Sequence, residues 1–142
     1  MNSKFKKQQG FAAIEMMIAT PVLLFFLVLV LELGNILIHY NIISKSVQNG
    51  ARYAVTEVYG TQGGTVAPTA EIQNIVVYGK NTVGTAILSS LVTSDVTITP
   101  PSGDSYVRVT VNYNYVPHFL SIPFSSESLS VPLSVSSVMR VF

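Results

Sequence analysis

The stretch GFAAIEMMIATPVLLFFLVLVLELGNIL, residues 10–37, decides how the rest of this 142-residue chain is organised. Between Glu15 and Glu32 it carries 16 consecutive residues without a charge. At ~1.5 Å per helical residue these span about 24 Å, less than the ~30 Å hydrocarbon layer of a bilayer. Counting from Phe11 gives about 31 Å, which is long enough. We therefore predict a transmembrane helix over about residues 11–32 that has to accommodate the Glu15 carboxylate.

Three lysines, Lys4, Lys6 and Lys7, precede this segment without an accompanying acid. Positive charge beside a membrane helix stays on the cytoplasmic side, so we expect a cytoplasmic N-terminus and a C-terminal domain across the membrane. A cleaved secretory signal is the alternative interpretation. The apolar run is longer than the about 7–15 residues typical of such signals, and the residues after Leu31, ELGNILIHY, offer no small-residue cleavage site.

Glu15 is costly in this position, because a charge near the bilayer centre costs about 2.5–3.5 kcal/mol on insertion scales. Gly10 followed by Phe11, with an acid at the fifth position after that junction, resembles the processing signal of type IV prepilins. The resemblance implies cleavage after Gly10, retention of the apolar helix and methylation of the new N-terminal Phe11. Cleavage creates an ammonium group at Phe11, one helical turn from Glu15 on the same face. A charge pair within one chain or between neighbouring chains relieves the desolvated carboxylate.

The helical pattern continues beyond the apolar segment. Over residues 44–58 the apolar positions recur at spacings typical of an amphipathic helix: Val47, Ala51, Ala54 and Val58. Gly50 costs about 1 kcal/mol relative to alanine but does not end the helix. We predict one long helix over residues 11–58, kinked at Pro21 and ended by Gly60 and the turn-forming run TQGGTVAP.

Glu32 lies at the far end of the apolar segment, where we expect the second membrane–water interface. Two interpretations stay open: a hydrated interfacial carboxylate, or a carboxylate that pairs with a partner subunit. His39 and Tyr40 follow as interfacial residues, since aromatic side chains are enriched at that depth. A lone histidine at helical spacing does not make a metal site.

Residues 59–142 are expected to form a small domain. Residues 69–77 predict a short helix with Thr69 as its N-cap and Gly79 at its C-terminal cap. Alternating residues predict three antiparallel strands, at 95–99, 107–115 and 129–135, the first two joined as a hairpin through PPSGD. Pro132 indicates an edge strand or a bulge, and the doubled Ser136-Ser137 fits a bulge or a strand end.

The predicted fold class is therefore α+β. A leader (residues 1–10) precedes the long helix (residues 11–58), whose membrane half continues into an amphipathic half. That second half packs on an antiparallel sheet of about three strands with one short helix, within a domain of residues 59–142.

Composition excludes several kinds of chemistry. The chain has no cysteine, so it has no disulfides and no thiolate metal sites. A net charge of +1 without a basic cluster beyond the leader argues against nucleic acid. No catalytic or nucleotide-binding motif occurs, and His118 lacks an evident acid partner for a hydrolase site. Tyr106, Tyr113 and Tyr115 fit sheet packing better than ligand stacking. We expect no enzymatic activity, no cofactor and no small-molecule substrate.

Four stretches together resemble the TadE-like family of minor pilins or pseudopilins from tight-adherence (Flp-type) systems: residues 10–37, SKSVQNGARYAV, EIQNIVVYGKNT and LSVPLSVSSVMRVF. The resemblance implies a bacterial inner-membrane protein with a periplasmic domain and a structural role in pilus assembly. Gly10 and Phe11 then flank the cut, Glu15 is the acid of the signal, and Glu32 with Gly34 matches the family's E-x-G at the helix exit.

The partners implied by the resemblance are a prepilin peptidase, other pilins or pseudopilins, the inner-membrane assembly platform and membrane lipid. Two alternatives stay open. One is a pseudopilin of a type II secretion system, and the other is a signal-anchored module whose tyrosine-rich sheet adheres to a surface.

Overall fold

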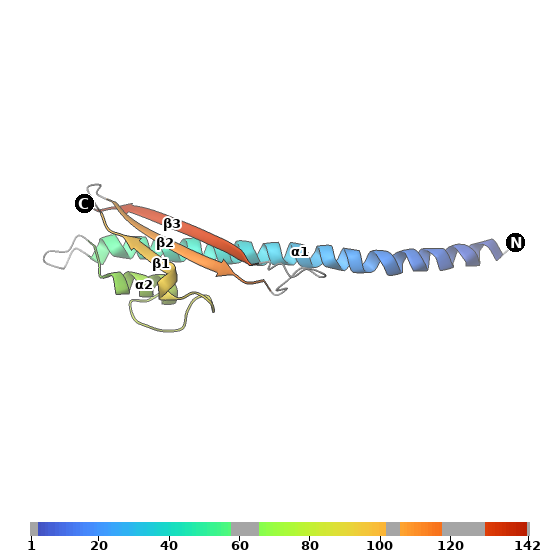
Figure 1. Cartoon of the computed structure of the whole chain (residues 1–142), viewed down its shortest axis with the longest axis horizontal. Helices are drawn as coiled ribbons and strands as arrows, with labels where there is room; N and C mark the ends of the chain where they lie inside the picture. The colour runs from blue at the N-terminus through green and yellow to red at the C-terminus, as the bar shows by residue number, and fades with distance from the viewer. Residues whose placement is uncertain (1–2, 58–65, 102–105, 118–129, 142) are drawn as a thin grey trace. The chain divides into compact units, whose positions relative to one another are not determined.

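The computed structural model describes residues 3–57, 66–101, 106–117 and 130–141, with the backbone alone for residues 3–9 (Figure 1). Its elements are α1 (Ser3–Thr56), α2 (Thr69–Tyr78), the short 3₁₀ helix η2 (Thr93–Asp95) and strands β1 (Val96–Thr99), β2 (Tyr106–Tyr115) and β3 (Val131–Arg140). The predicted α+β class is confirmed. The chain divides into two compact units, Met1–Asn35 and Ile36–Phe142.

Helix α1 is one continuous helix through both the apolar and the amphipathic segments. It begins at Ser3, earlier than the predicted start at residue 11, so the backbone of the leader is helical as well. The helix continues through Pro21, and Thr20 Oγ1 donates a hydrogen bond to the Met16 carbonyl one turn earlier. The predicted end of the helix at Val58 and the predicted stop signal at Gly60 lie outside the described residues.

The sheet is antiparallel with β2 in the centre, in the order β1-β2-β3. Strand β2 follows the predicted alternation: its inward side chains are all buried, namely Val107, Val109, Val111, Tyr113 and Tyr115. β1 pairs with β2 from Val96↔Val111 to Thr99↔Arg108, which confirms the predicted hairpin. The middle of its turn, residues 102–105, is outside the described residues.

Strand β3 corrects one expectation. The doubled serines neither bulge nor end the strand, because Ser136 pairs with Thr110 and Ser137 with Val109 in an unbroken register that continues to Arg140. Keeping the backbone ladder intact places Ser137 on the inner face and leaves Val138 45% exposed on the outer one. Pro132 lies on an edge strand, as predicted.

Helix α2 also differs from the sequence prediction at its start. Its N-cap is Pro68 rather than Thr69, and no side chain caps the helix. The Pro68 carbonyl accepts hydrogen bonds from the backbone N–H groups of Glu71 and Ile72. A proline ring already restricts φ to about −65°, which suits the extended backbone required here. At the other end Gly79 is left-handed (φ 72°), and its N–H donates to the Ile75 carbonyl as a C-terminal cap does.

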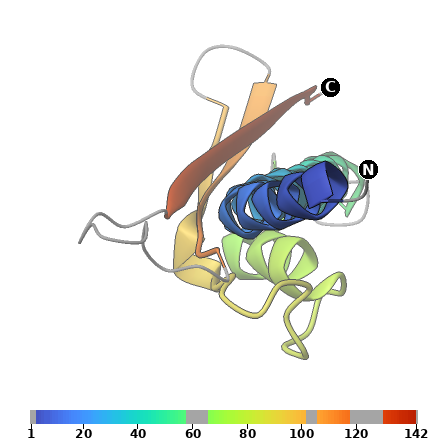
Figure 2. The same cartoon turned by 90° about the vertical axis from the view of Figure 1, so that its right-hand side faces the viewer.

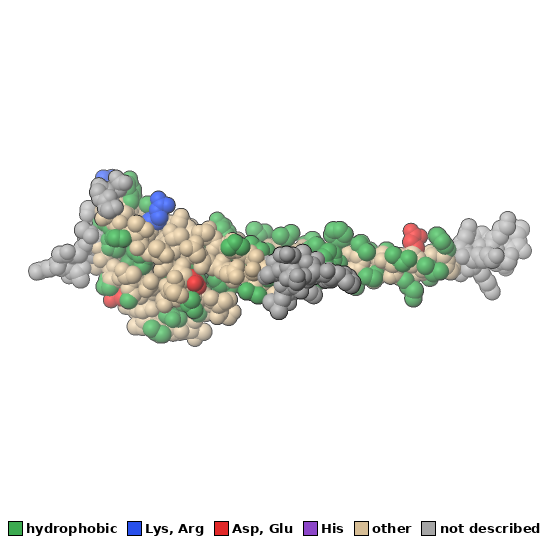
Figure 3. Space-filling model, viewed as in Figure 1, with side chains coloured by type: hydrophobic (Ala, Val, Ile, Leu, Met, Phe, Trp, Pro, Cys, Tyr) green, Lys and Arg blue, Asp and Glu red, His purple; other side chains and the backbone are tan. Residues whose placement is uncertain are grey.

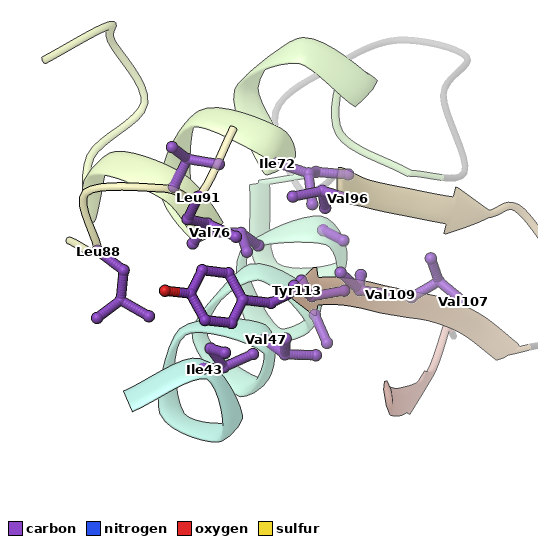
Figure 4. Packing of buried hydrophobic residues seen from close by; sticks show 14 of the residues in the cluster. Ile43, Val47, Ile72, Val76, Leu88, Leu91, Val96, Val107, Val109 and Tyr113 are labelled. Atoms are coloured by element: carbon purple, nitrogen blue, oxygen red, sulfur yellow. The ribbon is translucent and has the colours of Figure 1, made fainter. Parts of the chain in front are cut away.

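The hydrophobic core lies in the second unit. There the sheet and α2 cover different sides of the C-terminal part of α1 (Figure 2). The predicted stripe of α1 is confirmed at Val47, Ala51 and Ala54, which are fully buried, whereas Val58 lies outside the described residues. Figure 4 shows Val47 within this core. Gly50 is buried beside these three residues, and a Cβ at this position would overlap Val76 Cγ2 of α2. The glycine that weakens the helix locally thus permits its close contact with α2.

Candidate assembly surface on the N-terminal helix

In the first unit, α1 exposes many large apolar side chains, and hydrophobic side chains appear along the face of the helix seen in Figure 3. Those exposed by more than half their area between residues 11 and 33 are Phe11, Ile14, Met16, Met17, Ile18, Val22, Leu23, Leu24, Phe26, Leu27, Val30, Leu31 and Leu33. The helix is long and apolar enough to cross a membrane, and none of its most apolar window is buried within the chain. A helix that is apolar all round requires a protein core or a lipid environment. This surface suggests membrane anchoring.

The predicted processing residues lie at the start of this surface. Phe11 is 74% exposed, Glu15 is exposed, and a Cβ at Gly10 would meet no atom within 4 Å. Residues four apart on a helix are neighbours on one face, so Phe11 and Glu15 share a face of α1. In the uncut chain the Phe11 nitrogen belongs to a peptide bond, and the amine partner of Glu15 arises only through cleavage. Cleavage, methylation and charge pairing therefore stay predictions.

Glu32 has a different environment from Glu15. Its side chain is half-buried and has an interaction partner in the structure. A Cβ at Gly34, the second residue of the predicted E-x-G, would have open space around it. Whether Glu32 pairs with another subunit is untested, and both interpretations of this carboxylate stand.

A cluster that sequence reasoning missed joins α1 to the sheet in the second unit. The Tyr113 hydroxyl lies 3.3 Å from His39 Nδ1 and 3.1 Å from Ser90 Oγ. The His39 ring stands edge-on to Tyr115, with centroids 4.9 Å apart. We call these four residues the His39 cluster. Because a hydroxyl can donate one hydrogen bond and accept another, the Tyr113 hydroxyl can serve both His39 and Ser90.

The contacts of the His39 cluster pack α1 against the sheet. Among the described residues, no group of three His, Cys, Asp or Glu side chains is placed to hold a metal ion. One signal in the sequence indicated the cluster: His39 lies one turn before Ile43 on the buried stripe of α1, and Tyr113 and Tyr115 occupy inward positions of β2. As predicted, these two tyrosines serve sheet packing, whereas Tyr106 is 51% exposed.

The sequence of the segment that forms the apolar surface matches the model of a known protein family. Residues 10–52 are TadE-like: they match the family model described as TadE-like protein. This match confirms the predicted resemblance for residues 10–52. Comparison with curated proteins and with solved structures gives no match.

The TadE-like segment (residues 10–52) covers the exposed apolar surface and most of the buried stripe of α1. Directly after it, the Tyr53 hydroxyl donates a 2.7 Å hydrogen bond to Glu71 Oε2 and so links α1 to α2. This hydrogen bond raises the pKa of Tyr53 above its ordinary value, with desolvation and then the charges of Glu71 and Glu57 acting in the same direction.

His118, the histidine considered for a hydrolase site, lies outside the described residues. A hydrolase site around His118 is therefore neither supported nor tested by the structure.

Proposed function

We propose that this chain is a pilin-like structural subunit that a prepilin peptidase processes and that acts in assembly of a tight-adherence pilus at the bacterial inner membrane. The observation that carries the proposal is the exposed apolar surface of the TadE-like segment, which begins at the Gly10–Phe11 junction and contains Glu15 in its first turn. In this proposal the lysine-rich leader stays cytoplasmic and the second unit, Ile36–Phe142, faces the periplasm.

Removal of residues 1–10 gives the helix a charged amine that it lacks before cleavage. The amine of a methylated Phe11 stays a cation, so it can pair with the Glu15 carboxylate of the same or of a neighbouring chain. Such a pair offsets the cost of two desolvated charges only when both partners are present. Glu15 thereby favours contact with other pilins over dispersion in lipid. Glu32 is proposed to make a second contact of this kind at the opposite end of the apolar segment.

The partners in this proposal are the prepilin peptidase, other pilins or pseudopilins, the inner-membrane assembly platform and lipid. Two neighbouring functions differ from it in testable ways. A pseudopilin of a type II secretion system would have secretion genes beside its own, whereas a tight-adherence subunit would have pilus genes. A tyrosine-rich adhesive sheet is less favoured, because Tyr113 and Tyr115 are buried and of these three tyrosines Tyr106 is the one exposed.

Cleavage is tested with Gly10→Val expressed beside an active prepilin peptidase. The parent chain should lose ten residues from its N-terminus, seen by gel mobility and intact mass, and Gly10→Val should keep them. Gly34→Val is the matched control, because a Cβ at either glycine has open space around it. The full-length chain as the sole form of the parent beside the active peptidase would contradict the proposal.

Charge pairing is tested separately with Glu15→Val. Cleavage should remain largely intact while pilus formation or co-purification with other pilins falls. Met16→Val, an exposed neutral neighbour, serves as the control. Pilus formation at the parent level in Glu15→Val would rule out the pairing.

A further inference from the structure

Strand β3 is the long open edge of the sheet. The order β1-β2-β3 places the four-residue β1 at one edge and the ten-residue β3 at the other (Figure 1). In the part of the chain that the structure describes, no strand pairs with the outer side of β3. Unpaired N–H and C=O groups along such an edge are a template for another strand.

The middle of β3 lacks the features by which soluble proteins protect their edges. Those features are short length, proline, charge and bulges. Pro132 and Arg140 stand near the two ends of β3, and the residues between them, LSVSSVM (133–139), contain neither proline nor charge. The register with β2 is unbroken, so no bulge turns the edge away. β1, by contrast, is protected by its shortness.

The inner face of β3 is also incompletely covered. Val131, Leu133, Val135 and Met139 are half-buried, whereas the inward valines of β2 are fully buried. The apolar layer of the sheet thus thins out along the edge whose backbone is open. An additional strand beside β3 would satisfy backbone groups and cover apolar side chains at the same place.

The sequence of β3 favours its own copy as that strand. Directly opposite residues of an antiparallel pair lie on one face of the sheet, so inward residues have to meet inward residues. Two registers obey this condition over nine residues of β3, one centred on Val135 (131–139) and one centred on Ser136 (132–140). The register centred on Ser136 places Pro132, which has no N–H to donate, at the two ends of the new ladder instead of within it. It sets Leu133 against Met139 on the inner face and Ser134 against Val138 on the outer face.

Charge is compatible with this register as well. Arg140, the one charged residue of β3, meets Pro132 of the other copy, so no like charges are opposed. Pro132 fits an edge where its nitrogen faces the open side, since it has no N–H to contribute to the ladder with β2. The arrangement has a two-fold axis at Ser136, so both copies use the same surface.

We propose that two copies of this chain associate through antiparallel pairing of their β3 strands, centred on Ser136, to form a continuous six-stranded sheet. The second unit carries the whole contact, which requires neither cleavage at Gly10 nor the Glu15 pair. The contact thus adds an interaction surface to the proposed function without depending on it.

A charge swap at Ser136 tests the pairing in the full chain in detergent micelles. Ser136 is exposed on the outer face, so Ser136→Lys and Ser136→Glu leave the core intact. Each variant alone opposes like charges at the two-fold axis and should dimerise up to about fivefold more weakly than the parent. An equimolar mixture of the two should recover the dimer in sedimentation equilibrium. The matched control is an equimolar mixture of Ser134→Lys and Ser134→Glu. Mixing these two variants should not strengthen the dimer beyond that of either variant alone, because Ser134 faces Val138 and not its own copy.

A single cysteine gives an independent measurement, since the chain contains none. A short bis-thiol reagent should link Ser136→Cys to its own copy, with much less product for Ser134→Cys and none for Thr97→Cys on β1. A parent chain that stays monomeric, equal linking at Ser136→Cys and Thr97→Cys, or linking of Ser136→Cys in cells to a different protein alone would overturn the proposal. Repeating the measurement on uncleaved Gly10→Val separates the two proposals: linking should persist there whatever the fate of the leader.

Discussion

Val30 and Val47 are both valines of helix α1, yet Val30 is 64% exposed and Val47 is fully buried. In the first unit, Met1–Asn35, apolar side chains cover α1 all round and the chain itself buries few of them. In the second unit α1 is apolar along one stripe, which the sheet and α2 cover. The second part of α1 thus buries its apolar side chains within its own fold, whereas covering those of the first part would require lipid or partner helices.

The largest effect should come from a charge placed in each environment. Val47→Asp buries an unpaired carboxylate in the core and should lower the unfolding free energy of the second unit by more than about 4 kcal/mol. Val30→Asp should change that free energy by less than about 0.5 kcal/mol. Urea titration of the full chain in micelles, followed by the near-ultraviolet circular dichroism of its tyrosines, measures both. Equal losses in the two variants would remove the distinction between the regions.

Two of the three glycines of α1, Gly50 and Gly34, should respond differently to substitution by alanine. Gly50→Ala forces a methyl group into Val76, and overpacking of about 1–3 kcal/mol outweighs the about 1 kcal/mol gained in helix propensity. Gly34→Ala has open space and should cost nothing. The same urea titration measures whether each substitution raises or lowers the free energy of unfolding. A stabilised Gly50→Ala would mean that α1 and α2 do not approach as closely as described.

Removal of one hydroxyl from the His39 cluster should have a smaller effect. Tyr113→Phe leaves the ring in the core but deprives His39 and Ser90 of a shared partner, at a cost of about 1 kcal/mol. Tyr106→Phe, at an exposed position of the same strand, is the control and should be neutral. If Tyr113→Phe unfolds at the same urea concentration as the parent, the cluster contributes nothing to stability.

The smallest effect should be a pH dependence from Tyr53. Its pKa is raised in the folded chain, chiefly by the hydrogen bond to Glu71, so the protonated phenol is the form that folding favours. The stabilisation is present below the unfolded pKa of about 10 and is lost as pH rises through the higher folded value. The difference in stability between the parent and Tyr53→Phe should therefore be constant at neutral pH and shrink above about pH 10.

An ultraviolet titration of tyrosinate provides the check. The transition of Tyr53, obtained by subtracting the Tyr53→Phe curve from the parent curve, should move to lower pH in Glu71→Gln, since the neutral amide removes the carboxylate charge. An unchanged transition in Glu71→Gln would show that Glu71 is not the cause of the raised pKa.

Local patterns predicted most of the fold. Apolar residues without interruption and then at helical spacing predicted α1, and alternation predicted β1, β2 and the first part of β3. The resemblance to a prepilin processing signal could be recognised for the same reason, because Gly10, Phe11 and Glu15 are neighbours in the chain. Glu15 and Glu32 could be found from sequence, but their roles depend on chains and lipids beyond this one.

The details that sequence reasoning missed share a different cause. It assigned the cap of α2 to Thr69 by residue type, whereas the extended backbone at Pro68 provides it. It treated the doubled Ser136-Ser137 as a bulge or a strand end. Pairing with β2 instead keeps the register unbroken and tolerates Ser137 on the inner face. In both cases a backbone requirement outweighs the preference of one side chain.

The sequence by itself determined that the chain has a long apolar helix with a carboxylate near each end, followed by a small α+β domain. These properties depend on residues within a few turns or a single strand, so periodicity and charge are enough to reveal them. The tertiary structure alone decided that Gly50 meets Val76, that His39 shares the Tyr113 hydroxyl with Ser90, and that β3 is an edge strand of the sheet formed by the described residues. Each of these depends on which distant segments pack together, and all the contacts of the core together determine that packing.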